Sequence, residues 1–294
     1  MAKIIDGRAI SAEIKQELRE RTVAFEEMFG FKPGLAVVLV GTDPASRIYV
    51  NNKRKACEEI GYNSFVYELS TETTEAELLD LVEQLNNRDD VHGILVQLPL
   101  PKHINEDKVI LAISPDKDVD AFHPHNVGLI MQGNARFLPC TPAGVMELLK
   151  RSNIDIAGKE CVIVGRSNIV GKPLAMLMLQ ANGTVTICHS KTTNLREVCK
   201  RADVLVAAIG KPKFFDTSYV KEGAVVIDVG INRLETGKLC GDVDFNEVEN
   251  IASAITPVPG GCGVMTIAML MKNTFEAALY AASQKSGNEF TYNF

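Results

Sequence analysis

Residues 162–173 read Val162-Ile163-Val164-Gly165-Arg166-Ser167-Asn168-Ile169-Val170-Gly171-Lys172-Pro173, and this stretch decides the fold. Its β-branched start predicts a buried strand, and Gly165 and Gly171 predict a tight turn into a helix. Such a turn suits a dinucleotide, because glycine lets the backbone approach a pyrophosphate and the helix N-terminus supplies free N–H groups. The spacing departs from G-x-G-x-x-G, so a plain strand-to-helix turn is the alternative.

The coenzyme is indicated by the residues that follow the next predicted strand. An NAD site would place an acid there to bind the ribose hydroxyls. This chain has His189-Ser190-Lys191-Thr192 instead and no acid before Glu197. Arg166, Ser190 and Lys191 would suit a 2′-phosphate, since each charge-assisted hydrogen bond contributes on the order of 1.5–3 kcal/mol. We therefore expect NADP; the alternative is that Lys191 is an ordinary solvated lysine.

Strand and helix patterns alternate along most of the 294 residues, which predicts an α/β fold with parallel sheets. A continuous apolar run at 35–40 is typical of a strand buried on both faces. Further strands are predicted at 64–68, 93–98, 161–164, 184–188, 204–209, 224–229 and 253–256. Helices are predicted at 8–29, at 44–60, after the capping box Thr74–Glu77, from an N-cap at Thr141, and at 266–283. A long irregular stretch is expected after Pro99, and a loose tail beyond Gly287.

The composition is that of an ordinary enzyme, with 46% hydrophobic residues and a net charge of −6. This excludes a disordered chain and a generally basic nucleic-acid binder. Seven scattered cysteines without a C-x-x-C pair read as reduced thiols. We expect no signal peptide, no membrane span and a cytoplasmic location.

Polar residues with a potential chemical role lie in the first half of the chain. Tyr49 and Lys53 are spaced i and i+4 and so share a helix face. Gln97 stands at the carboxyl end of a predicted strand, where open α/β sheets bind ligands. The structural alternatives are that Tyr49 is a core or rim aromatic residue, that Lys53 is a surface charge and that Gln97 caps a neighbouring loop.

Other candidates are weaker when taken alone. Asp120 could be a turn former bonded to its own backbone. His123 and His125 lack a third ligand of the usual spacing, so no metal is expected. Cys262 lies in the glycine-rich turn 256–263, which is either structural or lines a pocket, and no basic neighbour adjoins it in sequence to make it reactive.

Five motifs, taken in order, resemble the methylenetetrahydrofolate dehydrogenase/methenyltetrahydrofolate cyclohydrolase family. They are Tyr49-Val50-x-x-Lys53, Val96-Gln97-Leu98-Pro99-Leu100-Pro101, Asp118-Val119-Asp120, Gly165-Arg166-Ser167 and Pro257-Val258-Pro259-Gly260-Gly261. The likeness covers essentially the whole chain, and five ordered motifs are far more specific than any one of them.

The resemblance implies an enzyme that oxidises 5,10-methylenetetrahydrofolate with NADP and then hydrolyses the methenyl cation to 10-formyltetrahydrofolate. It implies two α/β lobes with a cleft between them: a folate-binding catalytic domain (1–139 plus 266–294) and a Rossmann-like NADP-binding domain (140–265). It also implies tetrahydrofolate substrates, a homodimer, and a place in one-carbon metabolism and purine biosynthesis, with neither nucleic acid nor membrane as partner.

By the same resemblance, Lys53 handles the proton of the hydrolysis, Gln97 holds Lys53, Tyr49 stacks on the folate and Asp120 binds the amino-pyrimidine edge of the pterin. Further implied substrate contacts are Leu98, Pro99, Pro259, Gly260 and Gly263. The implied cofactor contacts are Gly165, Arg166, Ser167, Gly171, Ser190, Lys191 and Ile231.

Two residues depart from the family pattern. Ala121 stands where the family generally has glycine, and Val264 where it has proline. If position 121 takes a positive φ, alanine costs roughly 1 kcal/mol and could displace Asp120. These two departures leave open an inactive protein that still binds nucleotide and folate. A separate alternative is an NADP oxidoreductase for a different small substrate, in which Tyr49 and Asp120 recognise something other than a pterin.

Overall fold

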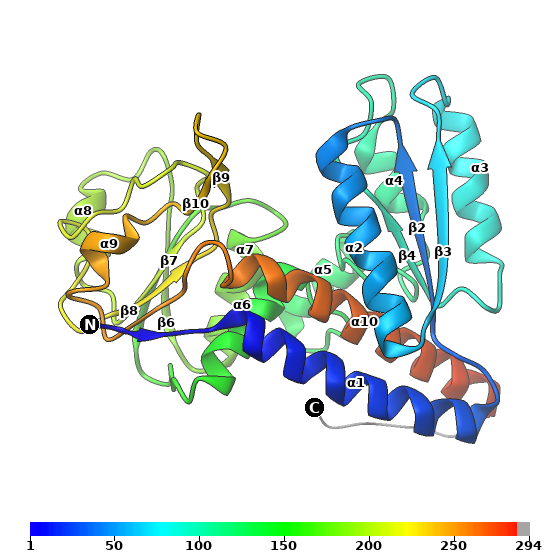
Figure 1. Ribbon diagram of the computed structural model, residues 1–294, viewed down its shortest axis with the longest axis horizontal. Coiled ribbons are helices and arrows are strands. Elements are labelled where there is room, and N and C mark those ends of the chain that lie inside the picture. Colours follow the sequence, from blue (N-terminus) through cyan, green and yellow to red (C-terminus); the bar gives the residue numbers. More distant parts are fainter. Residues whose placement is uncertain (287–294) are drawn as a thin grey trace. The chain divides into compact units, whose positions relative to one another are not determined.

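The computed structural model describes residues 1–286 and divides the chain into two compact units (Figure 1). Unit 1 contains Met1–Ala12 and Pro139–Met269, and unit 2 contains Glu13–Leu138 and the last helix from Leu270 onward. The predicted domains differ at the N-terminus, because β1 (Lys3–Ile4) pairs with β11 (Ala254–Ile255) and so joins unit 1. The predicted loose tail beyond Gly287 lies outside the described residues.

Unit 1 is built on a parallel six-stranded sheet with the order β1-β11-β8-β7-β5-β6. Its four longer strands are β5 (Glu160–Val164), β6 (Thr184–Cys188), β7 (Val204–Ala207) and β8 (Val225–Asp228), and β6 is at the edge of the sheet. The remaining elements are α6 (Cys140–Arg151), α7 (Gly171–Gln180), α8 (Leu195–Cys199), α9 (Phe245–Val248) and the β9–β10 hairpin (Asn232–Arg233, Leu239–Cys240). The predicted Rossmann-like strand series is confirmed, and the strand ends differ from the predicted ones by at most two residues.

Unit 2 has a parallel three-stranded sheet, β3-β2-β4. Its strands are β2 (Gly34–Val40), β3 (Asn63–Leu69) and β4 (Gly93–Val96). Every residue of β2 is buried, which confirms the prediction for 35–40. Helices α2 (Pro44–Ile60) and α3 (Glu75–Asn86) follow β2 and β3, and the capping box at Thr74 is present.

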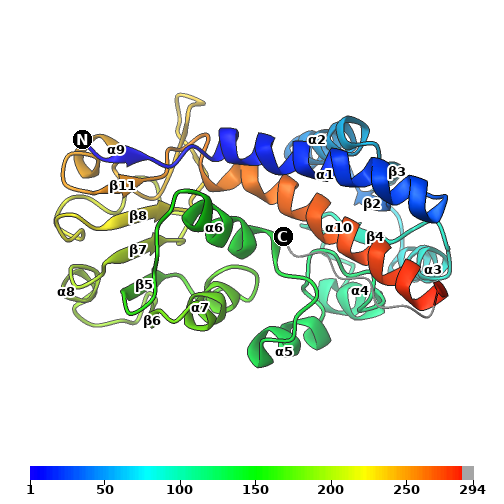
Figure 2. The same cartoon turned by 90° about the horizontal axis from the view of Figure 1, so that it is seen from below.

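Two long helices take part in both units, α1 (Gly7–Phe29) and α10 (Cys262–Ser286). Within unit 2 they run side by side (Figures 1 and 2), and the rings of Phe25 and Phe275 lie 5.5 Å apart. Within residues 1–286, no helix combines the length and the apolarity needed to span a bilayer.

One prediction of an irregular stretch and two predictions of helix starts were wrong. The stretch after Pro99 contains two short helices, α4 (Glu106–Ala112) and α5 (Pro124–Gln132), each with a side-chain N-cap. Helix α6 begins at Cys140 with Pro139 as N-cap, so Thr141 is already helical. Helix α10 begins at Cys262 rather than at residue 266, because Gly260 at φ +114° makes the turn and leaves the next residues free to be helical.

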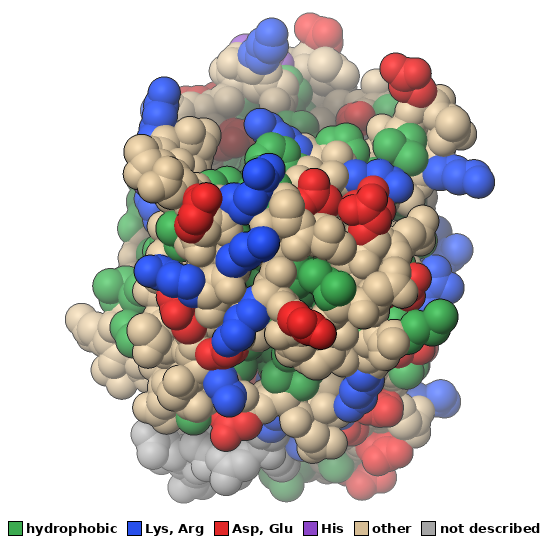
Figure 3. All heavy atoms as spheres, turned by 90° about the vertical axis from the view of Figure 1, so that its left-hand side faces the viewer, with side chains coloured by type: hydrophobic (Ala, Val, Ile, Leu, Met, Phe, Trp, Pro, Cys, Tyr) green, Lys and Arg blue, Asp and Glu red, His purple; other side chains and the backbone are tan. Residues whose placement is uncertain are grey.

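Charges of both signs share the face of unit 1 around α8 and α9, which Figure 3 turns toward the viewer. In the described part of this face, acidic side chains lie between the basic ones, and hydrophobic side chains are scattered. A continuous basic surface, as nucleic acids require, is not formed there.

Candidate functional site

Two of the three predicted catalytic side chains of unit 2, Lys53 and Gln97, are in contact. Lys53 is only 8% exposed, and its Nζ donates a hydrogen bond to Gln97 Oε1 at 2.8 Å. Gln97 Nε2 in turn donates to the Leu98 carbonyl at 2.7 Å, which sets the orientation of the amide. Tyr49, one turn earlier on α2, is 44% exposed, so its ring is open to a ligand.

This meeting follows from the parallel sheet. Gln97 comes directly after β4, and its N–H still donates to the Val38 carbonyl of β2 at 2.8 Å. Helix α2 starts from the same edge, because it follows β2 in the chain. Both side chains therefore belong to the carboxyl edge of the sheet, where α/β proteins bind their ligands.

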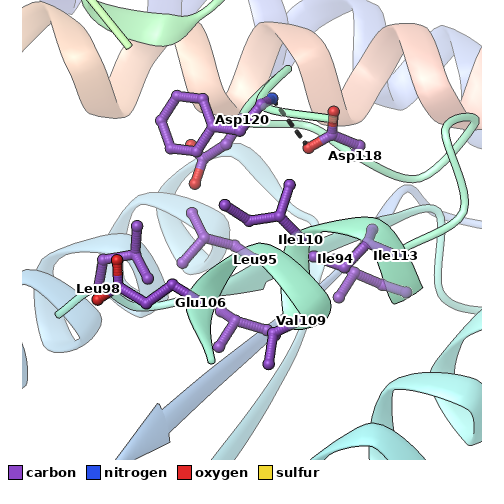
Figure 4. A pocket seen from close by; sticks show the side chains of 11 residues that line it. Ile94, Leu95, Leu98, Glu106, Val109, Ile110, Ile113, Asp118 and Asp120 are labelled. Atoms are coloured by element: carbon purple, nitrogen blue, oxygen red, sulfur yellow. Dashed lines mark hydrogen bonds between the residues drawn. The ribbon is translucent and has the colours of Figure 1, made fainter. Parts of the chain in front are cut away.

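Asp120 and Leu98, two predicted substrate contacts, line one small cavity of unit 2 (Figure 4). Most of its other walls are apolar: Ile94, Leu95, Val96, Val109, Ile110, Ile113 and Phe122. The space amounts to about 20 Å³, room for about one water molecule. Asp120 is half-buried beside these apolar side chains. Their low dielectric constant strengthens the electrostatic interactions of its carboxylate.

The segment that carries Asp120 is held by two residues that sequence reasoning did not assign. Buried Asp118 accepts hydrogen bonds from His123 N at 2.9 Å and Asn126 Nδ2 at 2.8 Å, and burial raises its pKa. Asn273 of α10 donates from Nδ2 to the carbonyls of Val119 (2.7 Å) and Leu138 (2.8 Å). No local sequence pattern singled out Asn273.

Ala121 adopts the left-handed conformation that the sequence comparison anticipated, with φ +56° and no exposed surface. Its N–H donates to the Asp118 carbonyl at 3.0 Å, so the strained residue closes a turn directly after Asp120. Alanine in this region carries a steric cost of about 1 kcal/mol that glycine avoids.

Replacing Ala121 with glycine should therefore raise the free energy of unfolding by about 0.5–1 kcal/mol, since relief of strain exceeds the added entropy of the unfolded chain. Urea denaturation of the two proteins measures the change. Ala157→Gly, at an exposed loop position outside the left-handed region, is the matched control and should be neutral or destabilising. A destabilised Ala121→Gly protein would contradict the assignment of strain.

The predicted dinucleotide turn of unit 1 leaves no room for side chains at its two glycines. Gly165 has φ +140°, and a Cβ there would lie 2.3 Å from the Ala208 carbonyl oxygen. A Cβ on Gly171, the first residue of α7, would lie 2.1 Å from the Gly165 carbonyl oxygen. Ser167 Oγ accepts from Val170 N at 3.1 Å and Gly171 N at 3.4 Å. This is the tight strand-to-helix turn that can approach a pyrophosphate.

Arg166, Ser190 and Lys191 are all exposed at the carboxyl edge of the sheet of unit 1. They follow β5 and β6, which pair in register with Val164 opposite Cys188. Among residues 1–286, Arg166 and Lys191 form no ion pair with an acidic side chain, so both cations are available to an anion. The turn itself is held by Lys191 N donating to His189 Nδ1 at 3.1 Å.

Pro99, a predicted substrate contact in unit 2, is exposed and directly follows Leu98. The remaining predicted contacts belong to unit 1. Ile231 follows β8 and is 47% exposed, and a Cβ on Gly263 would lie 2.7 Å from Ile231 Cδ1. One predicted cofactor residue and one predicted substrate residue thus touch. Pro259 is exposed next to Gly260, and Val264 lies in the first turn of α10, where its carbonyl accepts from Ser11 Oγ at 3.2 Å.

The structure gives His123 and Cys262, which the sequence analysis considered as a metal ligand and a reactive thiol, defined surroundings. His123 caps α5, since its Nδ1 accepts from His125 N at 3.1 Å. Cys262 is 3% exposed, and burial raises the pKa of its thiol, which agrees with the inert interpretation.

Comparison with known proteins agrees with this geometry. The family model described as the tetrahydrofolate dehydrogenase/cyclohydrolase catalytic domain matches residues 5–120, and the model of the corresponding NAD(P)-binding domain matches residues 139–282. The chain is 64% identical over 284 residues to the bifunctional protein FolD of Acetivibrio thermocellus, covering 97% of this chain and 99% of the relative.

Solved structures give the same result. The chain is similar to the bifunctional FolD dehydrogenase/cyclohydrolase of Campylobacter jejuni, with a TM-score of 0.92 and 53% identity over 95% of this chain and 99% of that one. It is also similar to the Trypanosoma brucei methylenetetrahydrofolate dehydrogenase-cyclohydrolase complexed with NADP and an inhibitor, with a TM-score of 0.91 and 38% identity over 98% of this chain and 99% of that one. The chain therefore belongs to the tetrahydrofolate dehydrogenase/cyclohydrolase family.

Proposed function

We propose a division of labour between named residues for the two reactions of this enzyme. The chain is a bifunctional enzyme: it oxidises 5,10-methylenetetrahydrofolate with NADP to 5,10-methenyltetrahydrofolate, and it hydrolyses that product to 10-formyltetrahydrofolate. The observation that carries the residue assignment is the buried Lys53–Gln97 hydrogen bond within the matched catalytic domain.

The residues of unit 1 fit NADP. The pyrophosphate would be held by the backbone at Gly165 and Gly171, where there are no side chains, and by the N-terminus of α7. Ser167 would add a hydroxyl beside it. Arg166, Ser190 and Lys191 would bind the 2′-phosphate, and Ile231 would contact the cofactor through its exposed side chain. When bound, NADP supplies the hydride acceptor of the first reaction.

Oxidation demands little acid–base chemistry from the protein. As hydride leaves the methylene carbon of the folate, its two nitrogens delocalise the positive charge, so alignment of the reactants is what the protein must supply. We assign this to Tyr49, whose open ring stacks on the folate, and to Asp120, which accepts hydrogen bonds from the amino-pyrimidine edge. Leu98, Pro99, Pro259, Gly260 and Gly263 would complete the substrate contacts.

Hydrolysis demands a proton acceptor, because a water must lose a proton as it attacks the methenyl carbon. Lys53 is the group that we assign to this step, either as base or as the group that orients the water. Gln97 Oε1 fixes the position of its Nζ, and the nearly complete burial of Lys53 keeps bulk water from competing with that contact. A coupled assay of both reactions on the purified protein tests the whole assignment; NADP reduction with hydroxy acids but not with methylenetetrahydrofolate would overturn it.

The preference for NADP is predicted to depend on Arg166. Arg166→Ala removes a charge-assisted contact to the 2′-phosphate and should raise the Kd of NADP by about 10- to 150-fold, while the Kd of NAD changes little. Isothermal titration with both coenzymes measures the difference. Lys159→Ala removes the same charge from an exposed site just before β5, at the opposite edge of the sheet, and should change neither value. Equal losses for both coenzymes in Arg166→Ala would refute the 2′-phosphate role.

We further propose that the enzyme is a cytoplasmic homodimer whose product serves purine biosynthesis. The sheet of unit 1 ends in β6, an edge strand on which Ile187 is 37% exposed, and such an edge can pair with a second copy. Sedimentation of the wild type and of Ile187→Lys tests the dimer.

A further inference from the structure

Two buried carboxylates that no assigned role uses lie in unit 1. Asp242 has no exposed surface and Asp228 is 3% exposed. Asp228 ends β8, and Asp242 follows β10 by two residues. Burial of a carboxylate is costly unless hydrogen bonds replace its water, so the partners of these two groups reveal what the charges do.

Asp242 binds the backbone of one loop and the side chain of another. Its Oδ2 accepts from Ile209 N at 2.7 Å and Gly210 N at 2.9 Å, in the loop after β7. Its Oδ1 accepts from Lys211 N at 2.8 Å and from Asn232 Nδ2 at 2.9 Å. Asn232 directly follows Ile231, so one carboxylate joins the loops that leave β7 and β8.

Asp228 holds Asp242 in place. Its Oδ1 accepts from Asp242 N and from Gly230 N, both at 2.9 Å, and its Oδ2 accepts from Val243 N at 2.9 Å. The packing leaves no space: a Cβ on Gly230 would lie 2.3 Å from Asp242 Oδ1, and a Cβ on Gly241 would lie 1.8 Å from Asp228 Oδ2. The loops after β7 and β8 and the segment 240–243 thus form one hydrogen-bonded assembly.

Burial of these two acids is electrostatically unfavourable. Burial, together with the charge of Asp242, raises the pKa of Asp228 to about 7, against the opposing effect of its N–H partners. Two neighbouring acids in a buried position cost folding free energy. In return, their four oxygens accept hydrogen bonds from six backbone N–H groups and from the Asn232 amide. The arrangement therefore fixes the geometry of the loops at the expense of folding free energy.

The position of these loops suggests what the geometry is for. In the order β8-β7-β5-β6, the glycine turn follows β5 and the predicted 2′-phosphate residues follow β6. A dinucleotide lies across the point where the strand order reverses, so its other half falls over the loops that follow β7 and β8. Those are the loops that Asp242 joins.

We propose that Asp228 and Asp242 are positioning residues, which we call the carboxylate clamp, and that the clamp holds the loops 208–211 and 229–232 ready to receive the nicotinamide half of NADP. This rests on the proposed placement of NADP at the glycine turn. A preformed loop lowers the ordering entropy that binding would otherwise cost, so the clamp acts before the cofactor arrives.

The test is Asp242→Asn, which keeps the shape of the side chain but turns one acceptor oxygen into a donor. In the cofactor-free protein, hydrogen exchange of the amides 209–211 should become at least about tenfold faster, and the Kd of NADP should rise by about tenfold or more. Urea denaturation of the variant checks that unit 1, which contains Asp242, is still folded. Asn232→Ala is the milder second variant: it removes one donor, should loosen 229–232 and should weaken NADP less.

Asp203→Asn is the matched control. Asp203 also accepts from a backbone N–H, that of Glu160 at 2.9 Å, but it lies directly before β7, at the opposite edge of the sheet. The substitution Asp203→Asn should leave the hydrogen exchange of the amides 209–211 and the Kd of NADP unchanged. Unchanged exchange and affinity in Asp242→Asn would overturn the clamp, while a normal loss of NADP in Arg166→Ala would show that the proposed cofactor site still stands.

Discussion

Lys53→Met should lower the rate of methenyltetrahydrofolate hydrolysis by a factor of about 10²–10⁴, the usual contribution of a positioned proton-handling group. Methionine keeps the length and apolar volume of the side chain but removes the amine that lies 2.8 Å from Gln97 Oε1. The dehydrogenase reaction of the same variant should fall far less, because hydride transfer asks for alignment and not for a base.

Lys53→Arg should not restore hydrolysis. The guanidinium stays protonated and presents a rigid planar fork that does not fit an amine site only 8% exposed. Lys55→Met, at an exposed position on the same helix, is the matched control and should keep both activities. Stopped-flow absorbance of the methenyl compound measures the rates, and full hydrolysis by Lys53→Met would remove Lys53 from the mechanism.

Gly165→Ala should weaken NADP by about 100-fold, equivalent to about 2.7 kcal/mol. The added Cβ would have to occupy a point 2.3 Å from the Ala208 carbonyl oxygen, at a φ of +140°. The turn must therefore shift, and a shifted turn no longer brings its N–H groups to the pyrophosphate.

Gly158→Ala separates this effect from general backbone strain. Gly158 also has a positive φ, +70°, but no atom lies within 4 Å of its Cβ position. Its replacement should lower the free energy of unfolding by about 1 kcal/mol and leave the Kd of NADP unchanged. Titration of both variants with NADP measures the contrast; the same affinity in both would mean that Gly165 has no special part in the site.

Much of the site could be read from local patterns, because those patterns depend on neighbouring residues only. The i, i+4 spacing placed Tyr49 and Lys53 on one helix face, and the glycines of 162–173 predicted the turn that the structure has. Element ends were less predictable: α6 and α10 begin two and four residues earlier than predicted.

The residues that sequence reasoning missed act through contacts between distant parts of the chain. Asn273 reaches the carbonyl of Val119, 154 residues away, and Asp242 reaches Ile209 across 33 residues. No spacing rule links such pairs, since their approach depends on the order of strands in a sheet and the path of the chain between them.

The sequence by itself determined the alternation of strands and helices, the glycine turn between β5 and α7 and the types of residue available for chemistry, because periodicity and turn preferences are local properties. The tertiary structure alone decided that β1 joins unit 1, that Gln97 meets Lys53 across 44 residues, and that two acids clamp the loops after β7 and β8. The physical reason is that these contacts form only when the sheets assemble and bring the carboxyl ends of separate strands to one edge.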